Sequence, residues 1–181
     1  FNTPGDAQDV VVIDKRVFVS DGRSGISVLA INNPANIQAI TEAHLDVRSG
    51  KLKSEGNKLY FVHNRTGIQT ADISNRRAPV LYKAVNINSP IHDLAVQGGF
   101  VFLATERGLV VLDYSNPDDP QEVSNYPISG GLTGIYIQGQ IGYAIDRVGL
   151  RLLDFSHAPE IHEIGKKPTP GEANAIYVQD S

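Results

Sequence analysis

A short apolar phrase occurs four times in this chain at a nearly constant interval, and this repetition constrains the fold more than any other feature. Each phrase follows a glycine, these glycines recur at intervals of about 41 residues, and an aromatic residue precedes each of them in one register. The phrases are ISVLAINNP (26–34), IQTADISNR (68–76), LVVLDYSNP (109–117) and LRLLDFSHA (150–158), the glycines are Gly25, Gly67, Gly108 and Gly149, and the aromatic residues are Phe18, Tyr60, Phe102 and Tyr143.

The repeat is built from short segments of β-branched and aromatic residues separated by turn residues, and it lacks helical periodicity. In the first repeat these segments are residues 7–14, 16–21, 26–31 and 37–45. A period of roughly 40 to 45 residues with four short strands is typical of a β-propeller blade. We therefore predict a single all-β domain, a β-propeller of four-stranded blades at about 6–47, 48–89, 90–130 and 131–171.

The strands of each repeat differ in polarity. The first and third are nearly continuously apolar, which predicts burial on both faces between neighbouring blades, whereas the fourth alternates and carries charge, as an outer edge does. The second repeat departs from this plan, because its first segment, GKLKSEGN (50–57), carries lysines and a glutamate. We expect that blade to have the most solvated or least regular inner strand.

The two ends of the chain resemble each other. Residues 168–181 (PTPGEANAIYVQDS) repeat the opening NTPGDAQDVVVID, with Gly171 matching Gly5 and Ile176 matching Val10. Residues 172–181 are therefore predicted to be the first strand of a further blade, in a segment of a larger propeller or of an assembly of copies, because natural sheets avoid exposed apolar edges. A closed ring of four blades, with one of the two equivalent strands displaced, is the alternative.

Composition excludes several classes of function. The net charge is −4 and 20% of residues are charged, so no broad basic surface for nucleic acid is expected. The absence of cysteine excludes disulfides and thiolate metal sites. Apolar runs such as VVVI and LVVL are far shorter than the roughly 18 to 20 residues of a membrane-spanning helix. The chain begins with Phe1 and has no methionine, which indicates a processed or incomplete start from which a signal peptide could have been lost.

Recurrent glycines and aspartates are assigned to turns. Gly25, Gly67, Gly108 and Gly149 precede the third strand, where a positive φ or a close backbone approach is usually required. Asp72, Asp113 and Asp154 end that strand and precede serine, so they are expected to cap backbone amides rather than to bind metal.

LVVLD (109–113), LRLLD (150–154) and the following D-x-S-N-P turn resemble the LVIVD repeat family, which consists of propeller-type repeats typical of bacterial and archaeal surface or secreted proteins. The first repeat departs from the pattern at Ala30, and the second has no proline directly after Asn75. The resemblance implies an extracellular or cell-surface location and carries over no catalytic residues.

Polar residues at the inner ends of the first strands are the candidate ligand site. In a propeller these positions line the mouth of the central channel, where a mixture of carboxylates, a lysine and a histidine could hold a polar ligand or a cation such as calcium. A solvated rim is the alternative. No cofactor or catalytic motif is predicted, and the histidines lack the spacing of a metal site. The candidate residues are Asp9, Lys51, His92, Asp93, Thr133 and Asn174.

Three functions remain open. The leading hypothesis is a non-enzymatic extracellular scaffold that binds a protein, a glycan or further copies or blades through its loops and edges. A propeller enzyme, a hydrolase or lyase acting around Asp9, His92 and Asp93, is the second. The third is a structural subunit that joins copies into a fibre or layer by strand addition.

Overall fold

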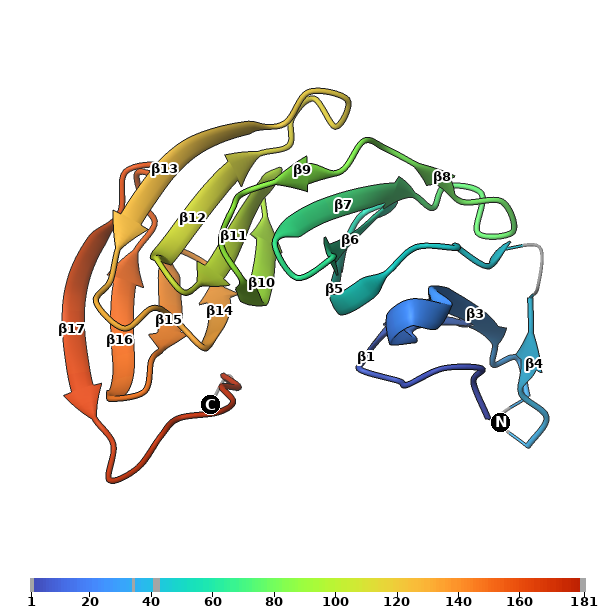
Figure 1. The fold of residues 1–181 in the computed structure, drawn as a ribbon, viewed down its shortest axis with the longest axis horizontal. Coiled ribbons are helices and arrows are strands. Elements are labelled where there is room, and N and C mark those ends of the chain that lie inside the picture. Colours follow the sequence, from blue (N-terminus) through green and yellow to red (C-terminus); the bar gives the residue numbers. More distant parts are fainter. Residues whose placement is uncertain (1, 34, 41–42, 180–181) are drawn as a thin grey trace. The chain divides into compact units, whose positions relative to one another are not determined.

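The computed structural model describes residues 2–33, 35–40 and 43–179, and it confirms the all-β propeller fold (Figure 1). All strand pairs are antiparallel, and within these residues the one helical element is a short 3-10 turn, η1 (Gly22–Ser24). Contacts divide the chain into two compact units, Phe1–Asn88 and Ser89–Ser181, and each unit contains two sheets.

The first unit contains blades 1 and 2, whose strands pair in chain order. The outer strand of blade 2 is split into two pieces, because β8 and β9 both pair with β7. Blade 1 comprises β1 (Asp9–Ile13), β2 (Arg16–Ser20), β3 (Ile26–Ala30) and β4 (Gln38–Ala39); blade 2 comprises β5 (Ser49–Glu55), β6 (Lys58–His63), β7 (Gly67–Asp72), β8 (Val80–Leu81) and β9 (Val85–Asn86).

The second unit contains blades 3 and 4, again with strands in chain order. Their outer strands, β13 and β17, are seven residues long. Blade 3 comprises β10 (Ile91–Gln97), β11 (Phe100–Thr105), β12 (Gly108–Asp113) and β13 (Gln121–Pro127); blade 4 comprises β14 (Gly134–Gln138), β15 (Ile141–Ile145), β16 (Gly149–Asp154) and β17 (His162–Pro168).

Each blade carries a row of directly paired side chains that we call the forward row, because in blades 1 and 3 it packs on the following blade. Residues paired across antiparallel strands lie on one face of the sheet. The forward rows of blades 1 and 3 pack on the faces of blades 2 and 4 that are opposite to those blades' own forward rows. The forward rows are Val11–Phe18–Val28 in blade 1, Lys53–Tyr60–Thr70 in blade 2, Ala95–Phe102–Val111 in blade 3 and Tyr136–Tyr143–Leu152 in blade 4.

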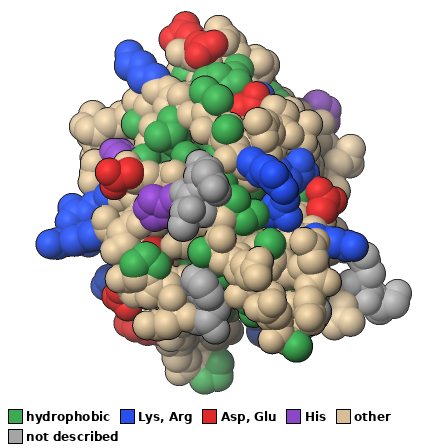
Figure 2. Space-filling view, turned by 90° about the vertical axis from the view of Figure 1, so that its right-hand side faces the viewer, with side chains coloured by type: hydrophobic (Ala, Val, Ile, Leu, Met, Phe, Trp, Pro, Cys, Tyr) green, Lys and Arg blue, Asp and Glu red, His purple; other side chains and the backbone are tan. Residues whose placement is uncertain are grey.

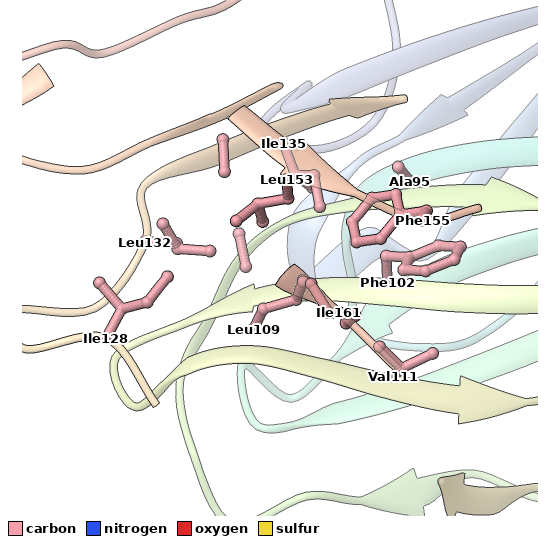
Figure 3. Close-up of a cluster of buried hydrophobic side chains, with 12 residues drawn as sticks. Ala95, Phe102, Leu109, Val111, Ile128, Leu132, Ile135, Leu153, Phe155 and Ile161 are labelled. Carbon is pink, nitrogen blue, oxygen red and sulfur yellow. The ribbon is translucent and has the colours of Figure 1, made fainter. Parts of the chain in front are cut away.

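The hydrophobic cores lie between the blades of each unit. In the first unit, Phe18 and Val28 pack with Leu52, Leu59 and Phe61 of blade 2. In the second, the forward row of blade 3 packs on blade 4, as Figure 3 shows. The Phe102 and Phe155 rings stack there with their centroids 4.7 Å apart. Burial of these side chains, at about 25 cal/mol per Å² of apolar area, is the main term that holds the blades of a unit together.

The outer strands contain bulges, and in blade 1 this shortens the strand predicted over 37–45. Between the pairs Leu29↔Ala39 and Ile26↔Leu45, β3 advances three residues while the outer segment advances six. In the other blades the outer strand gains one residue over the same span. The prediction was therefore wrong in extent, because residues 40, 43 and 44 are not part of a strand; positions 41–42 of that segment lie outside the described residues.

Two further expectations about strands differ from the structure. The lysine-bearing inner strand of blade 2, β5, is continuous over seven residues; it contains a bulge, but β10 contains one too, so β5 is not the single least regular inner strand among those described. The more exposed inner strand is β1, where Val10 and Val12 are 55% and 57% exposed, because within the first unit no sheet covers that face. Residues 172–179, predicted as a strand, form none, since no strand pairs with them in the described chain.

Candidate functional site

Two of the predicted rim residues connect neighbouring blades. An Asp9 carboxylate oxygen accepts a hydrogen bond from the Leu52 amide at 2.9 Å, which joins β1 to β5. An Asp93 carboxylate oxygen accepts one from the Ile135 amide at 3.1 Å, which joins β10 to β14 in the same way. Hydrogen bonds to a charged acceptor are among the stronger ones in proteins. We call these two bonds the aspartate tethers; the structure gives both carboxylates a role in holding blades together.

The remaining rim residues do not converge on one point. Lys51 and Asn174 are exposed, and His92 Nε2 lies 4.0 Å from a Glu106 carboxylate oxygen. The Thr133 hydroxyl lies within donor distance of the Ile145 carbonyl (3.2 Å) and the Ala173 carbonyl (3.0 Å), so it holds the chain that follows β17. Asp9 and Lys51 belong to the first unit and the other four to the second. The ligand or cation predicted at these residues stays a prediction.

The turn glycines share a close approach to the outer strand. A Cβ at Gly25 would lie 2.1 Å from the Leu45 carbonyl oxygen, and one at Gly108 would lie 2.4 Å from that of Tyr126. These two residues also have positive φ values of 88° and 120°. Gly67 has no such φ, and its Cβ would lie 3.1 Å from the Val85 carbonyl oxygen. A Cβ at Gly149 would likewise lie 2.2 Å from the Lys167 carbonyl oxygen. The four positions therefore require glycine for the same reason, the close approach of a backbone carbonyl of the outer segment.

The three turn aspartates accept hydrogen bonds from serine amides two residues on. The distances are 2.7 Å for Asp72, 2.7 Å for Asp113 and 2.8 Å for Asp154. These backbone hydrogen bonds, with help from the serine hydroxyls, hold the pKa of each carboxyl below its usual value. The arrangement is an Asx-turn, which stabilises the turn between the third and outer strands.

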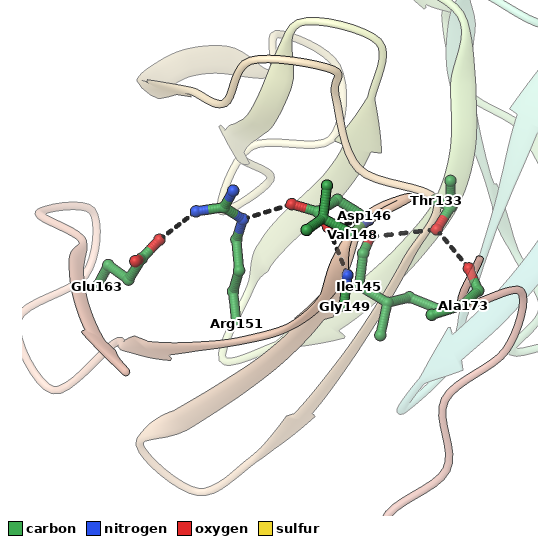
Figure 4. A network of polar contacts seen from close by, with 8 residues as sticks. All are labelled: Thr133, Ile145, Asp146, Val148, Gly149, Arg151, Glu163 and Ala173. Atoms are coloured by element: carbon green, nitrogen blue, oxygen red, sulfur yellow. Dashed lines mark hydrogen bonds and ion pairs between the residues drawn. The ribbon is translucent and has the colours of Figure 1, made fainter. Parts of the chain in front are cut away.

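Two buried carboxylates, Asp21 and Asp146, lie at equivalent positions at the end of the second strand, where the sequence predicts no more than solvation of a turn or loop. Asp21 accepts hydrogen bonds from the hydroxyls of Thr3 (2.7 Å) and Ser27 (3.2 Å). Asp146 accepts one from the Arg151 Nε at 2.7 Å, and Arg151 reaches Glu163 at 2.6 Å (Figure 4). The equivalent residues in the other two blades are His63 and Thr105, and this chemical variety argues against a repeated calcium ligand at the position.

The Asp146 carboxylate is stabilised in its charged form. Burial alone would raise its pKa, but the hydrogen bonds from Arg151 and from the amides of Val148 and Gly149 outweigh burial and lower the pKa. Arg151 is also stabilised in its charged form. Burial alone would lower its pKa, but its hydrogen bonds to Asp146 and Glu163 outweigh burial and raise the pKa. The network borders a pocket of about 190 Å³ that also includes Lys166 and Lys167. Since Arg151 is already paired with two carboxylates, its contacts here hold the turn and β17 in place.

The described residues contain neither a metal-binding cluster nor a helix that could span a membrane. Among residues 2–33, 35–40 and 43–179, no three His, Asp or Glu side chains are grouped so as to hold a metal ion. No helix within this part of the chain has the length and hydropathy to cross a membrane. On the face seen in Figure 2, basic, acidic and hydrophobic side chains are interspersed.

Comparison with solved structures gives the fold. The chain resembles the computationally designed Ika8 protein (TM-score 0.74, 14% identity, 94% of this chain and 52% of Ika8) and apo AztD from Citrobacter koseri (TM-score 0.67, 13% identity, 93% and 48%). It also resembles the computationally designed Ika4 protein (TM-score 0.65, 13% identity, 91% and 94%). The chain thus spans about half the length of Ika8 and AztD. No curated protein matched the sequence.

The LVIVD repeat family matches residues 4–41 and 91–127. These segments cover most of blade 1 and the strands of blade 3, so one match falls in each unit. The match confirms the resemblance inferred from LVVLD and its turn. Within its β-propeller fold, the chain therefore resembles the LVIVD repeat family over residues 4–41 and 91–127.

Proposed function

We propose that this chain is a non-enzymatic β-propeller module at the cell surface or outside the cell, which binds a protein partner through the forward row of blade 4. The LVIVD repeats support the surface setting, since such repeats are typical of surface or secreted proteins. The aspartate tethers and the buried Asp21 and Asp146 support a scaffold, because polar side chains serve the architecture at each of these places.

The main support for this proposal is that the forward row of blade 4 is more exposed than that of blade 3. In blade 3 the equivalent residues Ala95, Phe102 and Val111 are buried under blade 4. In blade 4, Tyr136 and Tyr143 are only half-buried, as is Leu152. Two tyrosines beside a leucine form the kind of surface that protein interfaces favour, because each ring offers a large apolar area and a polar tip.

The chain has no native cysteine, so single cysteines can report on this face. Tyr143→Cys places a thiol in the forward row of blade 4, and Tyr82→Cys places one on another half-buried tyrosine, in the outer segment of blade 2. Both variants would be treated with a membrane-impermeant maleimide, once as dilute purified protein and once on the intact cells that produce it. Thermal unfolding of each variant would establish that it folds.

The expected result separates location from binding. Tyr82→Cys reacts on intact cells as it does in solution, since it lies outside the cell and away from the interface. Tyr143→Cys reacts in dilute solution and is protected on cells, because a partner covers blade 4. Failure of Tyr82→Cys to react on cells would contradict the location, and equal labelling of Tyr143→Cys in both settings would contradict the binding face.

A further inference from the structure

The segment after β17 lies against β14. The Thr133 hydroxyl reaches the Ala173 carbonyl at 3.0 Å, and the Tyr136 and Tyr177 rings meet edge to face with centroids 6.1 Å apart. Figure 1 shows the chain running back from the end of β17 toward β14. In both units the inner strand of one blade contacts the inner strand of the next, as Asp93 shows by its bond to the Ile135 amide. Residues 172–179 thus lie where the inner strand of a blade beyond blade 4 would begin.

The sequence of this segment is that of an inner strand. TPGEANAIYVQD (169–180) and TPGDAQDVVVID (3–14) share six of twelve residues, and the second contains β1. In this alignment Tyr177 matches Val11 and Val178 matches Val12. Since Val11 pairs with Phe18 and Val12 with Val17, the segment carries the pattern that pairs with β2. Among the described residues no strand pairs with it, and it forms no strand itself, although it lies where an inner strand would begin.

We propose that residues 172–179 of one copy pair with β2 of a second copy in place of that copy's β1, so that the first strand of the joined blade comes from one chain and its other three strands from the other. This inference rests on the proposed binding role of blade 4 and names its partner. The forward row of blade 4 is then covered by blade 1 of the second copy.

The exchange of strands costs little because one inner strand replaces another of the same pattern. The incoming segment has Ala175 in place of Asp9, so it gives up one aspartate tether, to Leu52. The gain is burial of Tyr136, Tyr143 and Leu152 against the face of blade 1 that carries the half-buried Val17; Val19 and Leu29 of the same face are already buried. The corresponding faces of blades 2 and 4 already receive a forward row within each unit.

One sequence relation agrees with a second copy. In the joined blade Ile176 takes the place of Val10. The counterparts of this position in blades 2 and 4 are the aliphatic residues Leu52 and Ile135, which receive the forward row of the preceding blade.

Disulfide trapping tests the exchange. Val17→Cys and Val178→Cys chains, each with a single thiol, are mixed under mild oxidation; antiparallel partners bring Cα atoms within disulfide range. The matched control mixes Val17→Cys with Val80→Cys, a valine exposed on the outer piece β8. The double variant Val12→Cys/Val17→Cys locks β1 onto β2 within one chain and should hold the protein as a monomer by light scattering.

The expected result is a disulfide-linked heterodimer in the first mixture, at least about tenfold more abundant than in the control, and loss of the dimer when β1 is locked. The proposal is overturned if the locked disulfide forms readily while the first mixture gives no heterodimer. A Val17→Cys/Val178→Cys chain that closes on itself as a monomer also overturns it. Protection of Tyr143→Cys on cells without this cross-link would leave the proposed function standing and remove only the strand exchange.

Discussion

The two units build the same interface between blades but differ at their outer edges. In both, a forward row packs on the next blade and an aspartate joins the two inner strands. The second unit ends in the continuous strands β13 and β17, whereas the first ends in β4, β8 and β9, each of two residues. The fold thus depends on the inner three strands, and the outer strand is free to vary between blades.

Side-chain bonds besides the aspartate tethers join the blades in both units. In the second unit the Gln97 side chain donates a hydrogen bond to the Gly139 carbonyl at 2.7 Å. In the first unit the Ser49 hydroxyl donates one to the Gly25 carbonyl at 2.8 Å, and Arg76 pairs with Asp14 at 3.0 Å. The difference between the units therefore lies in the outer strands, and the long outer strands lead us to expect that the second unit tolerates less change at its edge than the first. Equivalent substitutions in the two units can test that expectation directly.

The largest expected effect is at the turn glycines. Gly108→Ala brings a Cβ to 2.4 Å from the Tyr126 carbonyl in β13 at a φ of 120°, and we expect it to cost about 3 kcal/mol or more of the free energy of unfolding. Gly67→Ala meets the Val85 carbonyl of the short β9 at 3.1 Å without an unfavourable φ, so we expect about 1 kcal/mol. Urea unfolding of both variants measures the difference.

Gly98→Ala is the control for backbone conformation alone. Gly98 has a φ of 63° with nothing within 4 Å of an added Cβ, so its cost of about 1 kcal/mol contains no steric part. If Gly108→Ala costs no more than this control, β13 yields as readily as the short strands do. The contrast between the two outer edges would then be lost.

Sequence patterns predicted the strands well because the signal lies within each repeat. Gly108 and Phe102 fix the register of their strands locally, so the inner three strands were predicted to within a few residues. The bulges in the outer strands were not predictable, since they depend on the register between two paired strands and not on the sequence of either strand alone. The extra residues in blade 1 give no signal of their own in the sequence.

The candidate site was less predictable for a related reason. Asp9 and Asp93 were recognised as inner-strand polar residues. The donors that they bind are backbone amides 43 and 42 residues away, and a backbone amide leaves no mark in the amino-acid sequence. Asp21 and Asp146 share a position with His63 and Thr105 that the sequence assigns to a solvated turn, but the burial of the two carboxylates and their Ser27 and Arg151 donors did not follow from the pattern. Bonds between blades require the folded arrangement before they can be identified.

The next effect concerns the buried carboxylates of the two units. Arg151→Met leaves Asp146 buried with only two backbone donors, and we expect a loss of about 1 to 3 kcal/mol in the free energy of unfolding near neutral pH. In the first unit Ser27→Ala removes one hydroxyl from Asp21 and should cost about 1 kcal/mol. Equal losses would show that the charged partner adds nothing.

Acid should separate these two variants further. The pKa of Asp146 is lower in the folded protein than in the unfolded chain, so its contribution to stability is complete above the unfolded pKa of about 3.9 and is lost as the pH falls through the folded value. Arg151→Met should therefore show a weaker fall in stability below about pH 4 than the parent protein. Urea unfolding midpoints from pH 6 to pH 3 give the comparison.

The smallest effect is expected at the aspartate tethers, where the two units should behave alike. Asp9→Ala and Asp93→Ala each remove one hydrogen bond between blades, and each should cost about 1 kcal/mol. Asp9→Asn and Asp93→Asn retain an oxygen that can accept the bond and should recover part of the loss. Hydrogen exchange at the Leu52 and Ile135 amides should rise in the alanine variants and fall back in the asparagine variants. A larger loss at Asp9 than at Asp93 would mean that the Gln97 bond compensates in the second unit more than the Ser49 bond and the Arg76 ion pair do in the first, which would extend the difference between the units from their edges to their centre.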